Sequence, residues 1–211
     1  MPVRIHTFVL GPLETNAYAL RDGGECWAVD PGMGSADLVR FLRREGTAPS
    51  RILLTHGHGD HIAGVPELRK AFPNVRVCCP AADAHMLADA EANLSGAFGF
   101  SFTVGRPDEL ISPGAAMALG ESSWQVLDTS GHTPGGVSYY CAQAGAVLTG
   151  DSLFAGGIGR FDIPGADGQA LLRNIRDKLL TLPPTTRVLP GHGPETTIGE
   201  ELRNNPFLSG V

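Results

Sequence analysis

The sequence predicts an α/β fold in which two mixed β-sheets pack together and helices cover the outside. Three observations support this prediction. Strand-like and helical segments alternate in both halves of the chain, the opening segments are all strand-like, and no linker or repeat interrupts the 211 residues. With 42% hydrophobic and 18% charged residues, a chain of this length can bury an ordinary core. We therefore expect one domain over residues 1–211.

The first half of the chain opens with three predicted strands, residues 3–10, 16–20 and 25–30, which Gly-Pro and Gly-Gly turns separate. A helix is predicted over 36–44, because apolar residues recur on one side and arginines on the other. The pattern then indicates a strand at 51–54, a helix at 61–72, a strand at 75–79 and an alanine-rich helix at 81–94. The glycine- and phenylalanine-rich residues 95–107 are predicted to form a loop over the site.

The second half follows the same alternation. Short apolar runs predict strands at 116–119, 124–128, 137–141, 146–148 and 187–189. A helix is expected to begin at Asp167 or Gly168 and to end before the paired prolines at 183–184. A last short helix is expected at 197–203, where Thr197 and Glu200 have the spacing of a capping box.

Composition argues against several classes of function. The formal net charge of −6 lowers the expectation of a nucleic-acid partner, which usually selects a basic face. No segment reaches the roughly 18 apolar residues of a membrane span, and the first 20 residues lack the features of a signal peptide. We therefore expect a cytoplasmic protein with no membrane partner. Whether it forms a homo-oligomer stays open.

The four cysteines show no C-x-x-C spacing. They are expected to be reduced, buried and apolar in character rather than zinc ligands. Cys78 and Cys79 are adjacent in a predicted strand, so their side chains should point to opposite faces.

Three of the seven histidines lie in one short segment, His56–His61. His56 and His58 are two positions apart, so an extended backbone directs both rings to the same side. The intervening glycines leave room for a metal ion, and Asp60 and His61 begin the next helix. Imidazole together with carboxylate suits zinc, iron or manganese better than calcium.

Three further candidates, His132, Asp151 and His192, each follow a predicted strand and have glycine neighbours. Active sites in α/β folds gather at the C-terminal ends of strands, so we expect these residues to join the histidine segment. Five histidines and two aspartates are too many for one tetrahedral zinc and suit two metal ions.

Other histidines and aspartates are less strongly expected to belong to the metal site. His6 and His85 lack glycine neighbours at a strand end and are expected to be ordinary surface or core residues. Asp30 and Asp128 also end predicted strands. Asp128 is a candidate for orienting a ligand histidine, and a turn or helix-cap role is the alternative.

The H-x-H-x-D-H segment, followed in order by His132, Asp151 and His192, resembles the metallo-β-lactamase superfamily of metallo-hydrolases over residues 16–208. The resemblance implies an αββα sandwich with the metal ions at one edge of the two sheets. Segments 130–136, 150–162 and 190–208 look most like the short form of the glyoxalase II branch, the hydroxyacylglutathione hydrolases. That short form lacks the C-terminal helical domain of full glyoxalase II.

The resemblance also implies a role for each candidate. One metal would be held by His56, His58 and His132, the second by Asp60, His61 and His192, and Asp151 would bridge them. Asp60 would in addition orient the nucleophile, which makes it the predicted catalytic residue.

Substrate binding is predicted for Arg160 and Phe161, which match a basic residue near glutathione and the first member of a following aromatic pair. Asp162 stands where the family has the second aromatic residue, so the resemblance is incomplete there. A salt bridge from Arg160 to Asp162 or Asp167 is the alternative role.

The implied activity is hydrolysis of a small-molecule thioester, with glutathione as a candidate thiol. A hydroxide that bridges two divalent ions, zinc first and iron or manganese as alternatives, would attack the thioester carbonyl. β-Lactamases commonly have cysteine where this chain has Asp151, which argues against β-lactam hydrolysis. The RNA-processing branch usually carries a basic insertion that this chain lacks.

Three alternatives stay open from the sequence. A persulfide dioxygenase of the same superfamily would use one iron held by His56, His132 and Asp151. Lactone or other ester hydrolysis would use the same metal chemistry. A non-enzymatic metal-binding domain is the third alternative.

Overall fold

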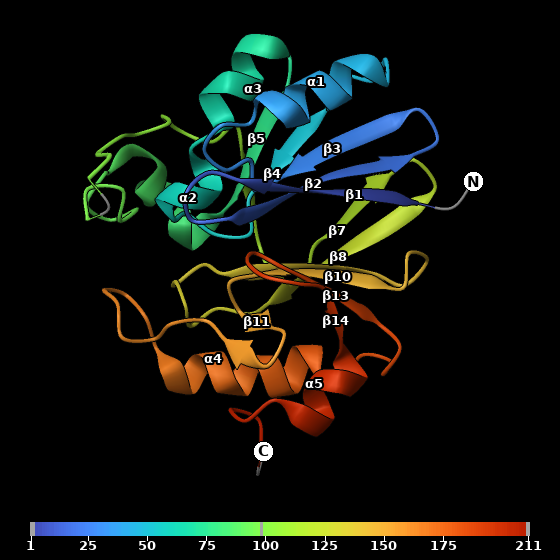
Figure 1. The fold of residues 1–211 in the computed structure, drawn as a ribbon, viewed down its shortest axis with the longest axis vertical. Coiled ribbons are helices and arrows are strands. Elements are labelled where there is room, and N and C mark those ends of the chain that lie inside the picture. The colour runs from blue at the N-terminus through green and yellow to red at the C-terminus, as the bar shows by residue number, and fades with distance from the viewer. Residues whose placement is uncertain (1–2, 98, 210–211) are drawn as a thin grey trace.

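The computed structural model describes residues 3–97 and 99–209, and in it two six-stranded sheets lie face to face between two layers of helices (Figure 1). The predicted α/β architecture of two mixed sheets with outer helices is therefore confirmed. The prediction of one domain over residues 1–211 includes positions 1–2, 98 and 210–211, which lie outside the described residues. No helix in the described part of the chain is long and apolar enough to cross a membrane.

The first sheet follows chain order and comes from the N-terminal half. Its strands are β1 (Arg4–Leu10), β2 (Thr15–Asp22), β3 (Glu25–Val29), β4 (Arg51–Leu53), β5 (Arg76–Pro80) and β6 (Glu109–Ile111). The first three strands pair antiparallel, and β3 to β6 pair parallel. The carboxyl ends of β3, β4 and β5 therefore meet at one edge of the sheet.

The second sheet has the order β14, β13, β10, β9, β8, β7. These strands span Thr196–Thr197, Arg187–Pro190, Ala146–Gly150, Val137–Cys141, Ser122–Asp128 and Ala116–Leu119. β10 and β13 are parallel, and the other neighbours are antiparallel. A short hairpin of β11 (Leu153–Phe154) and β12 (Gly157–Ile158) follows β10.

The helices form the outer layers. α1 (Ala36–Arg44) and α3 (Val65–Ala71) cover the first sheet, and α4 (Gly168–Asn174) and α5 (Ile198–Asn204) cover the second (Figure 1). The short α2 (Gly59–Ile62) and a 3₁₀-helix, Ala81–Ala88, follow β4 and β5. A π-helical turn, Ile175–Leu179, extends α4.

Three hydrophobic clusters hold the layers together. One lies between the first sheet and its helices, one between the two sheets, and one between the second sheet and α4 with α5. The cluster between the sheets contains the fully buried Trp27, Trp124 and Tyr139. Cys78 joins this cluster and Cys79 joins the outer one, which confirms that they point to opposite faces of β5. All four cysteines are buried and free, as predicted.

The predicted helix over 61–72 is wrong at its centre, where the chain forms α2 and α3 separately. Gly64 lies between them, and its amide donates to the Pro31 carbonyl at 2.7 Å. A side chain there would collide with the Gly32 carbonyl oxygen, because a Cβ would lie 2.5 Å from it. Pro66 then occupies the first turn of α3, where its missing N–H costs nothing.

The predicted helix over 81–94 is shorter and tighter than expected. The 3₁₀-helix ends at Ala88, because the Asp89 carboxylate accepts from the amides of Glu91 and Ala92 and closes a turn. Residues 95–107 contain no helix or strand in their described part, and Phe98 lies outside it. The predicted start of α4 at Asp167 or Gly168 is confirmed, and the Asp167 carboxylate caps the helix by accepting from the amides of Gln169 and Ala170.

Candidate metal centre

The seven predicted ligands come together at one edge of the two sheets. His56 and His58 follow β4, and Asp60 and His61 lie in α2. The second sheet contributes the remaining three from the segments after β8, β10 and β13, namely His132, Asp151 and His192. Both halves of the chain therefore supply side chains to the same place.

His56, His58 and His132 form the first group. Their ring nitrogens lie within 4.8 Å of one another, and His58 Nδ1 is 2.9 Å from His132 Nε2. All three side chains are buried. This is the trio that, by the family resemblance, would hold one metal ion.

Asp60, His61 and His192 form the second group. Asp60 Oδ2 lies 3.1 Å from His192 Nε2 and 3.4 Å from His61 Nε2. Their ligand atoms also lie within 4.8 Å of one another. The predicted second trio is thus assembled as well.

Asp151 lies between the two groups. Its Oδ1 is 3.2 Å from His61 Nε2, while Oδ2 is 3.6 Å from both His132 Nε2 and His192 Nε2. One carboxylate therefore contacts members of both groups, which is the position that a bridging ligand requires.

The donor set fits divalent metal ions. Four buried atoms of this cluster have no hydrogen-bond partner among the described residues: His56 Nε2, His58 Nε2, His61 Nε2 and Asp151 Oδ1. The last two approach each other but are not aligned for a hydrogen bond. A buried polar atom without a partner costs about 1–3 kcal/mol, and a metal ion removes this cost by accepting the lone pairs.

Burial lowers the pKa values of two histidines in the first group, which favours metal binding. Burial and the neighbouring His132 lower the pKa of His58 to about 3. Burial and the nearby histidines His61 and His58 also hold the pKa of His56 well below its usual value. Both rings are therefore neutral at pH 7 and keep a lone pair free for a metal ion.

The second group has the opposite electrostatics. Burial disfavours a charged His61, but Asp60, Asp151 and Asp30 together outweigh burial and hold the pKa of His61 well above its usual value. Metal binding at His61 must therefore displace a proton.

Asp30 orients rings in both groups. Its Oδ2 lies 3.0 Å from His61 Nδ1 and accepts from the Thr55 hydroxyl at 2.6 Å. Because Thr55 uses its proton on Asp30, it must accept from His56 Nδ1, 3.0 Å away. Both rings consequently direct Nε2 into the cluster. Asp30 is buried directly after β3, with φ of 46°.

Asp128, one candidate from the sequence for this orienting role, does not perform it. Asp128 accepts from the Ser130 amide at 3.0 Å and forms a turn, which was the alternative. Asp30 could have been identified by its position. It follows β3, and β3 lies next to β4, the strand that leads into His56.

Main-chain carbonyls orient two other ligands. His132 Nδ1 donates to the Arg160 carbonyl at 2.8 Å, and His192 Nδ1 donates to the Leu13 carbonyl at 2.9 Å. Each contact fixes the tautomer that leaves Nε2 free to face Asp151.

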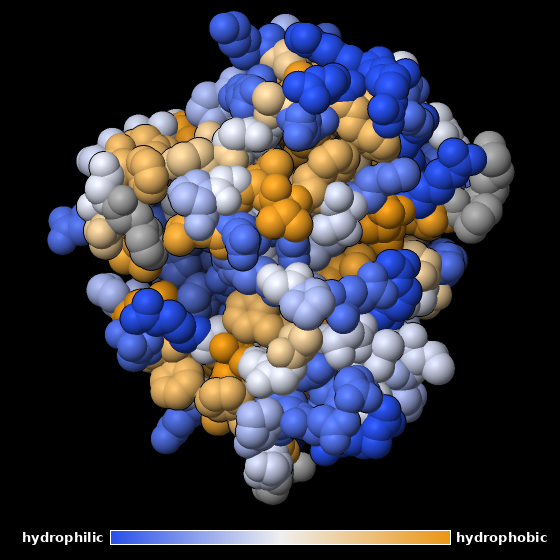
Figure 2. All heavy atoms as spheres, in the orientation of Figure 1, coloured by the Kyte–Doolittle hydropathy of each residue, from blue (hydrophilic) through white to orange (hydrophobic). Residues whose placement is uncertain are grey.

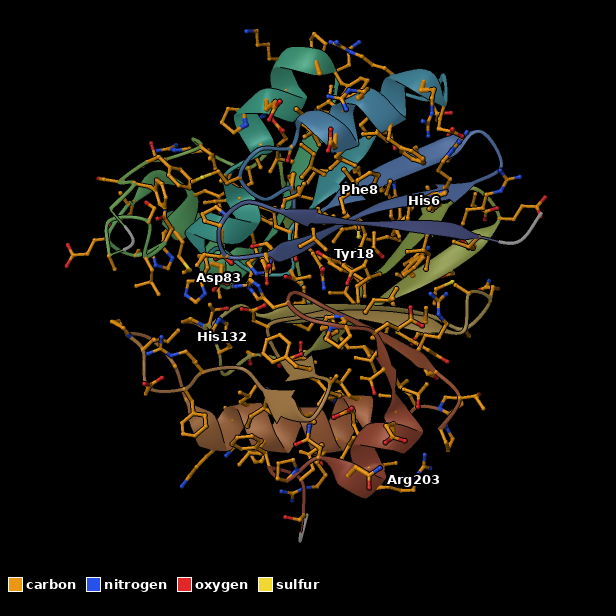
Figure 3. The ribbon with its side chains drawn as sticks, in the orientation of Figure 1. His6, Phe8, Tyr18, Asp83, His132 and Arg203 are labelled. Carbon is orange, nitrogen blue, oxygen red and sulfur yellow. The ribbon has the colours of Figure 1, made fainter. Side chains whose placement is uncertain are left out.

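Asp83 joins the two ligand-bearing segments and was missed in the sequence, where it looked like one residue of a helix. The fully buried carboxylate accepts from the Gly57 amide at 3.1 Å, the Thr133 hydroxyl at 2.7 Å and the Gly135 amide at 2.6 Å. Figure 3 shows Asp83 and His132 close together at the edge where the two halves of the molecule meet. Burial raises the pKa of Asp83, and these donors counteract the rise.

Gly191 permits the close approach of the last ligand segment. A Cβ at this position would lie 2.2 Å from Asp151 Oδ1 and 2.7 Å from His61 Cε1. Any side chain would therefore displace two predicted ligands, so glycine is required next to His192.

The predicted substrate-binding residues have different surroundings. A cavity of about 360 Å³ opens over the cluster, and Arg160 lines it together with five of the predicted ligands. Arg160 also forms a two-pronged salt bridge with Asp162, at 2.9 and 3.0 Å, so the alternative role is present too. Phe161 is half exposed, packs against Gly168 and is not among the described residues that line this cavity. Its role in substrate binding stays a prediction.

Neither remaining histidine belongs to the cluster, as predicted. The His6 ring packs against Phe41, and His85 Nδ1 contacts the Ala82 carbonyl at 3.1 Å.

Comparisons with proteins of known sequence indicate one protein family. The family model of the metallo-beta-lactamase superfamily matches residues 10–192. A probable metallo-hydrolase of Bacillus subtilis, YqgX, is 42% identical over 202 residues, which are 95% of each chain. The hydroxyacylglutathione hydrolase GloC of Haemophilus influenzae is 33% identical over 183 residues, which are 86% of each chain.

Solved structures agree with the family match. The structure described as the B3 metallo-beta-lactamase BLEG-1 has a TM-score of 0.93 at 39% identity, covering 98% of this chain and all of that one. The protein TTHA1623 in a di-iron-bound form has a TM-score of 0.87 at 39% identity, covering 96% of this chain and all of that one. Through its sequence, its layered fold and its His/Asp clusters, the chain belongs to the metallo-β-lactamase superfamily.

Proposed function

We propose that this metallo-hydrolase cleaves thioesters of the hydroxyacylglutathione type and holds two divalent metal ions, zinc in the first place. The observation that carries the proposal is the Asp151 carboxylate, which contacts both ligand groups. The similarity to GloC supports the choice of substrate class.

Metal ions and Asp60 have different roles in the proposed reaction. Divalent ions held there lower the pKa of water and polarise a carbonyl oxygen. Asp60 faces the cavity, and its Oδ2 accepts from the Thr15 hydroxyl at 3.0 Å. Burial opposes ionisation of Asp60, but His61 and His192 outweigh it and hold its pKa well below the usual range. Asp60 therefore remains a hydrogen-bond acceptor that can orient the nucleophile.

Thioester cleavage does not require a dedicated proton donor for the leaving group. A thiol has a pKa near 8.5, so a thiolate leaves without a general acid. Among the described residues that line the cavity, Arg160 is the side chain that can pair with a substrate carboxylate.

β-Lactam hydrolysis is a second candidate function. The presence of Asp151 argued against it, but a structure 39% identical to this chain is described as a B3 metallo-beta-lactamase. That similarity makes a β-lactam substrate a necessary comparison.

The deciding experiment uses purified protein whose metal content has been quantified. We expect loss of the S-lactoylglutathione thioester absorbance with about two metal ions per chain. A chromogenic cephalosporin is assayed beside it, and oxygen uptake is followed with glutathione persulfide. Faster cephalosporin turnover would favour the second candidate, and oxygen consumption with one iron per chain would replace the proposal by the dioxygenase alternative.

A further inference from the structure

We infer that Leu94 limits the size of the acyl group that the metal centre accepts, and that a strained main chain keeps its side chain in the cavity. The inference rests on the proposed thioesterase function and concerns the acyl side of its hydroxyacyl thioester substrate. Leu94 lines the cavity of about 360 Å³ over the cluster, together with His58 and Asp60, one member of each ligand group. A leucine side chain there occupies space that a large acyl group would need.

The main chain of Leu94 has a conformation that leucine rarely adopts. Its φ is 62°, in the left-handed region that favours glycine and that asparagine tolerates. Four described residues other than glycine have a positive φ, and Leu94 is the apolar one among them. Glycine would remove the strain but would leave no side chain in the cavity. Because strained residues of this kind cluster at active sites and ligand-binding positions, the leucine side chain itself is assigned a role in the site.

Buried polar side chains on both sides of Leu94 enforce this conformation. Asn93 Nδ2 donates to the Met86 and Phe102 carbonyls at 3.1 and 3.0 Å. Its Oδ1 accepts from the Ser95 amide at 2.9 Å, and the Ser95 hydroxyl donates to the Phe102 carbonyl at 3.1 Å. The strain at Leu94 therefore cannot relax unless these buried hydrogen bonds break.

The same turn lies directly against the ligand segment. The Asn93 carbonyl accepts at 2.7 Å from the amide of Gly59, the residue between two candidate ligands. A Cβ at Gly59 would lie 3.0 Å from the Ser95 Cβ, so the two segments are in close contact. Leu94 is consequently held at a fixed position relative to the metal centre.

Leu94 and Arg160 approach the cavity from different halves of the molecule. Leu94 follows the 3₁₀-helix of the first half, and the Arg160 carbonyl accepts from His132 in the second half. Figure 1 shows the two segments, green and orange, at the same edge, one on either side of the line where the sheets meet. The two substituents of a thioester carbonyl point apart, so a thiol part that pairs with Arg160 directs the acyl group towards Leu94.

Apolar and polar walls meet at the place where the acyl group would lie. In Figure 2, hydrophobic side chains border a recessed hydrophilic strip between the two halves of the molecule. A methyl group next to the carbonyl can pack against the Leu94 side chain and gains from leaving water. A phenyl group at the same position would need the space of that side chain, and forcing the two together costs free energy. Small 2-hydroxyacyl groups are therefore favoured.

The test compares S-lactoylglutathione with S-mandeloylglutathione, in which a phenyl group replaces the methyl group of the same 2-hydroxyacyl thioester. We expect Leu94→Ala and Leu94→Gly to raise the ratio of kcat/KM for the mandeloyl over the lactoyl substrate about tenfold. Leu110→Ala is the matched control and should keep the ratio of the unmodified protein, because Leu110 is 64% exposed on β6 and does not line the cavity.

A second readout tests the strained main chain without any turnover. In scanning calorimetry, Leu94→Gly should melt roughly 2–4 °C above Leu94→Ala, because glycine adopts a positive φ without strain and alanine does not. The same pair of substitutions at Leu110 should melt in the usual order, with alanine above glycine.

The outcomes separate this inference from the proposed function. An unchanged ratio in both Leu94 variants, with S-lactoylglutathione still cleaved, would overturn the size limit and keep the thioesterase. Leu94→Gly melting below Leu94→Ala would overturn the strained support. If no thioester is cleaved, the proposed function fails, and calorimetric titration of the metal-loaded protein with lactate and mandelate decides the role of Leu94. Mandelate affinity that increases relative to lactate in Leu94→Ala supports it, and an unchanged ratio or no binding of either acid overturns it.

Discussion

Asp30 orients two predicted metal ligands with one carboxylate, through direct contact with His61 and through Thr55 to His56. Neither ring could hold its tautomer without a partner on Nδ1. The positive φ of Asp30 is part of the same arrangement, because it turns the chain directly after β3 so that the carboxylate can face Thr55.

We predict that Asp30→Asn lowers metal affinity about 10–100-fold, because an amide supplies a weaker acceptor to His61 and breaks the relay to His56. Metal titration with a chelating indicator measures the effect. The matched control is Asp128→Asn, since Asp128 also ends a strand but contacts the Ser130 amide. Equal metal affinity in the two variants would contradict the orienting role of Asp30.

Asp151 and His61 test the two-metal assignment directly. We predict that Asp151→Ala or His61→Ala abolishes turnover and lowers the number of bound metal ions. His61 is a member of the second ligand group, and Asp151 contacts it. Elemental analysis and the thioester assay provide the readouts, with His85→Ala as a control outside the cluster. Full activity with full metal occupancy in either variant would refute the assignment.

At the scale of elements, the segment after β5 stabilises the site from outside the ligand set. Asp83, in the 3₁₀-helix, accepts three hydrogen bonds from the segments that carry His58 and His132. An ordinary α-helix was predicted there because alanine-rich composition favours one. Helix propensity does not decide the structure here. The buried Asp83 must keep its carboxylate next to the ligand-bearing segments, and the turn closed by Asp89 ends the helix.

We predict that Asp83→Ala lowers the free energy of unfolding by about 3 kcal/mol, because it leaves three buried donors without an acceptor. Urea unfolding monitored by fluorescence of Trp27 and Trp124 measures the change. Asp89→Ala, which removes an exposed acceptor from the same segment, should have less than a third of that effect. The reverse order of the two variants would show that Asp83 does not hold the segments together.

At the scale of the whole molecule, the metal centre connects the two halves of the chain. Four of the predicted ligands come from segments next to the first sheet and three from segments next to the second. Bound metal would therefore add cross-links between the sheets beyond the apolar cluster that already lies between them.

Metal removal is expected to destabilise the whole protein. A ligand at about 100 times its Kd adds ~2.7 kcal/mol to the free energy of unfolding. Scanning calorimetry with and without chelator should therefore show a lower Tm after metal removal. The Asp151→Ala variant should show a smaller difference, and an equal difference would place the stabilising metal elsewhere.

Metal binding is also expected to depend on pH. The surrounding carboxylates keep the pKa of metal-free His61 raised above its usual value, so the ring carries a proton at neutral pH. Metal displaces this proton, and affinity therefore increases as pH rises towards that raised pKa and decreases as pH falls. Calorimetric titration in buffers of different ionisation enthalpy measures the protons released. Binding without proton release at pH 7 would contradict the raised pKa.

Features that depend on local spacing could be predicted from the order of residues. Two histidines two residues apart in an extended segment face one way in any fold, and the alternation of strands and helices fixes which ends carry ligands. The convergence of the candidate ligands, the layered sheets and the opposite directions of Cys78 and Cys79 were accordingly predictable.

The residues that support these candidate ligands follow from long-range packing instead. Asp30 meets His61 across 31 positions, and Asp83 meets Gly135 across 52. Such pairings depend on strand order and on the packing of one sheet against the other, which no local pattern contains. The break between α2 and α3 has the same origin, since Gly64 must fit against the distant main chain of Pro31 and Gly32.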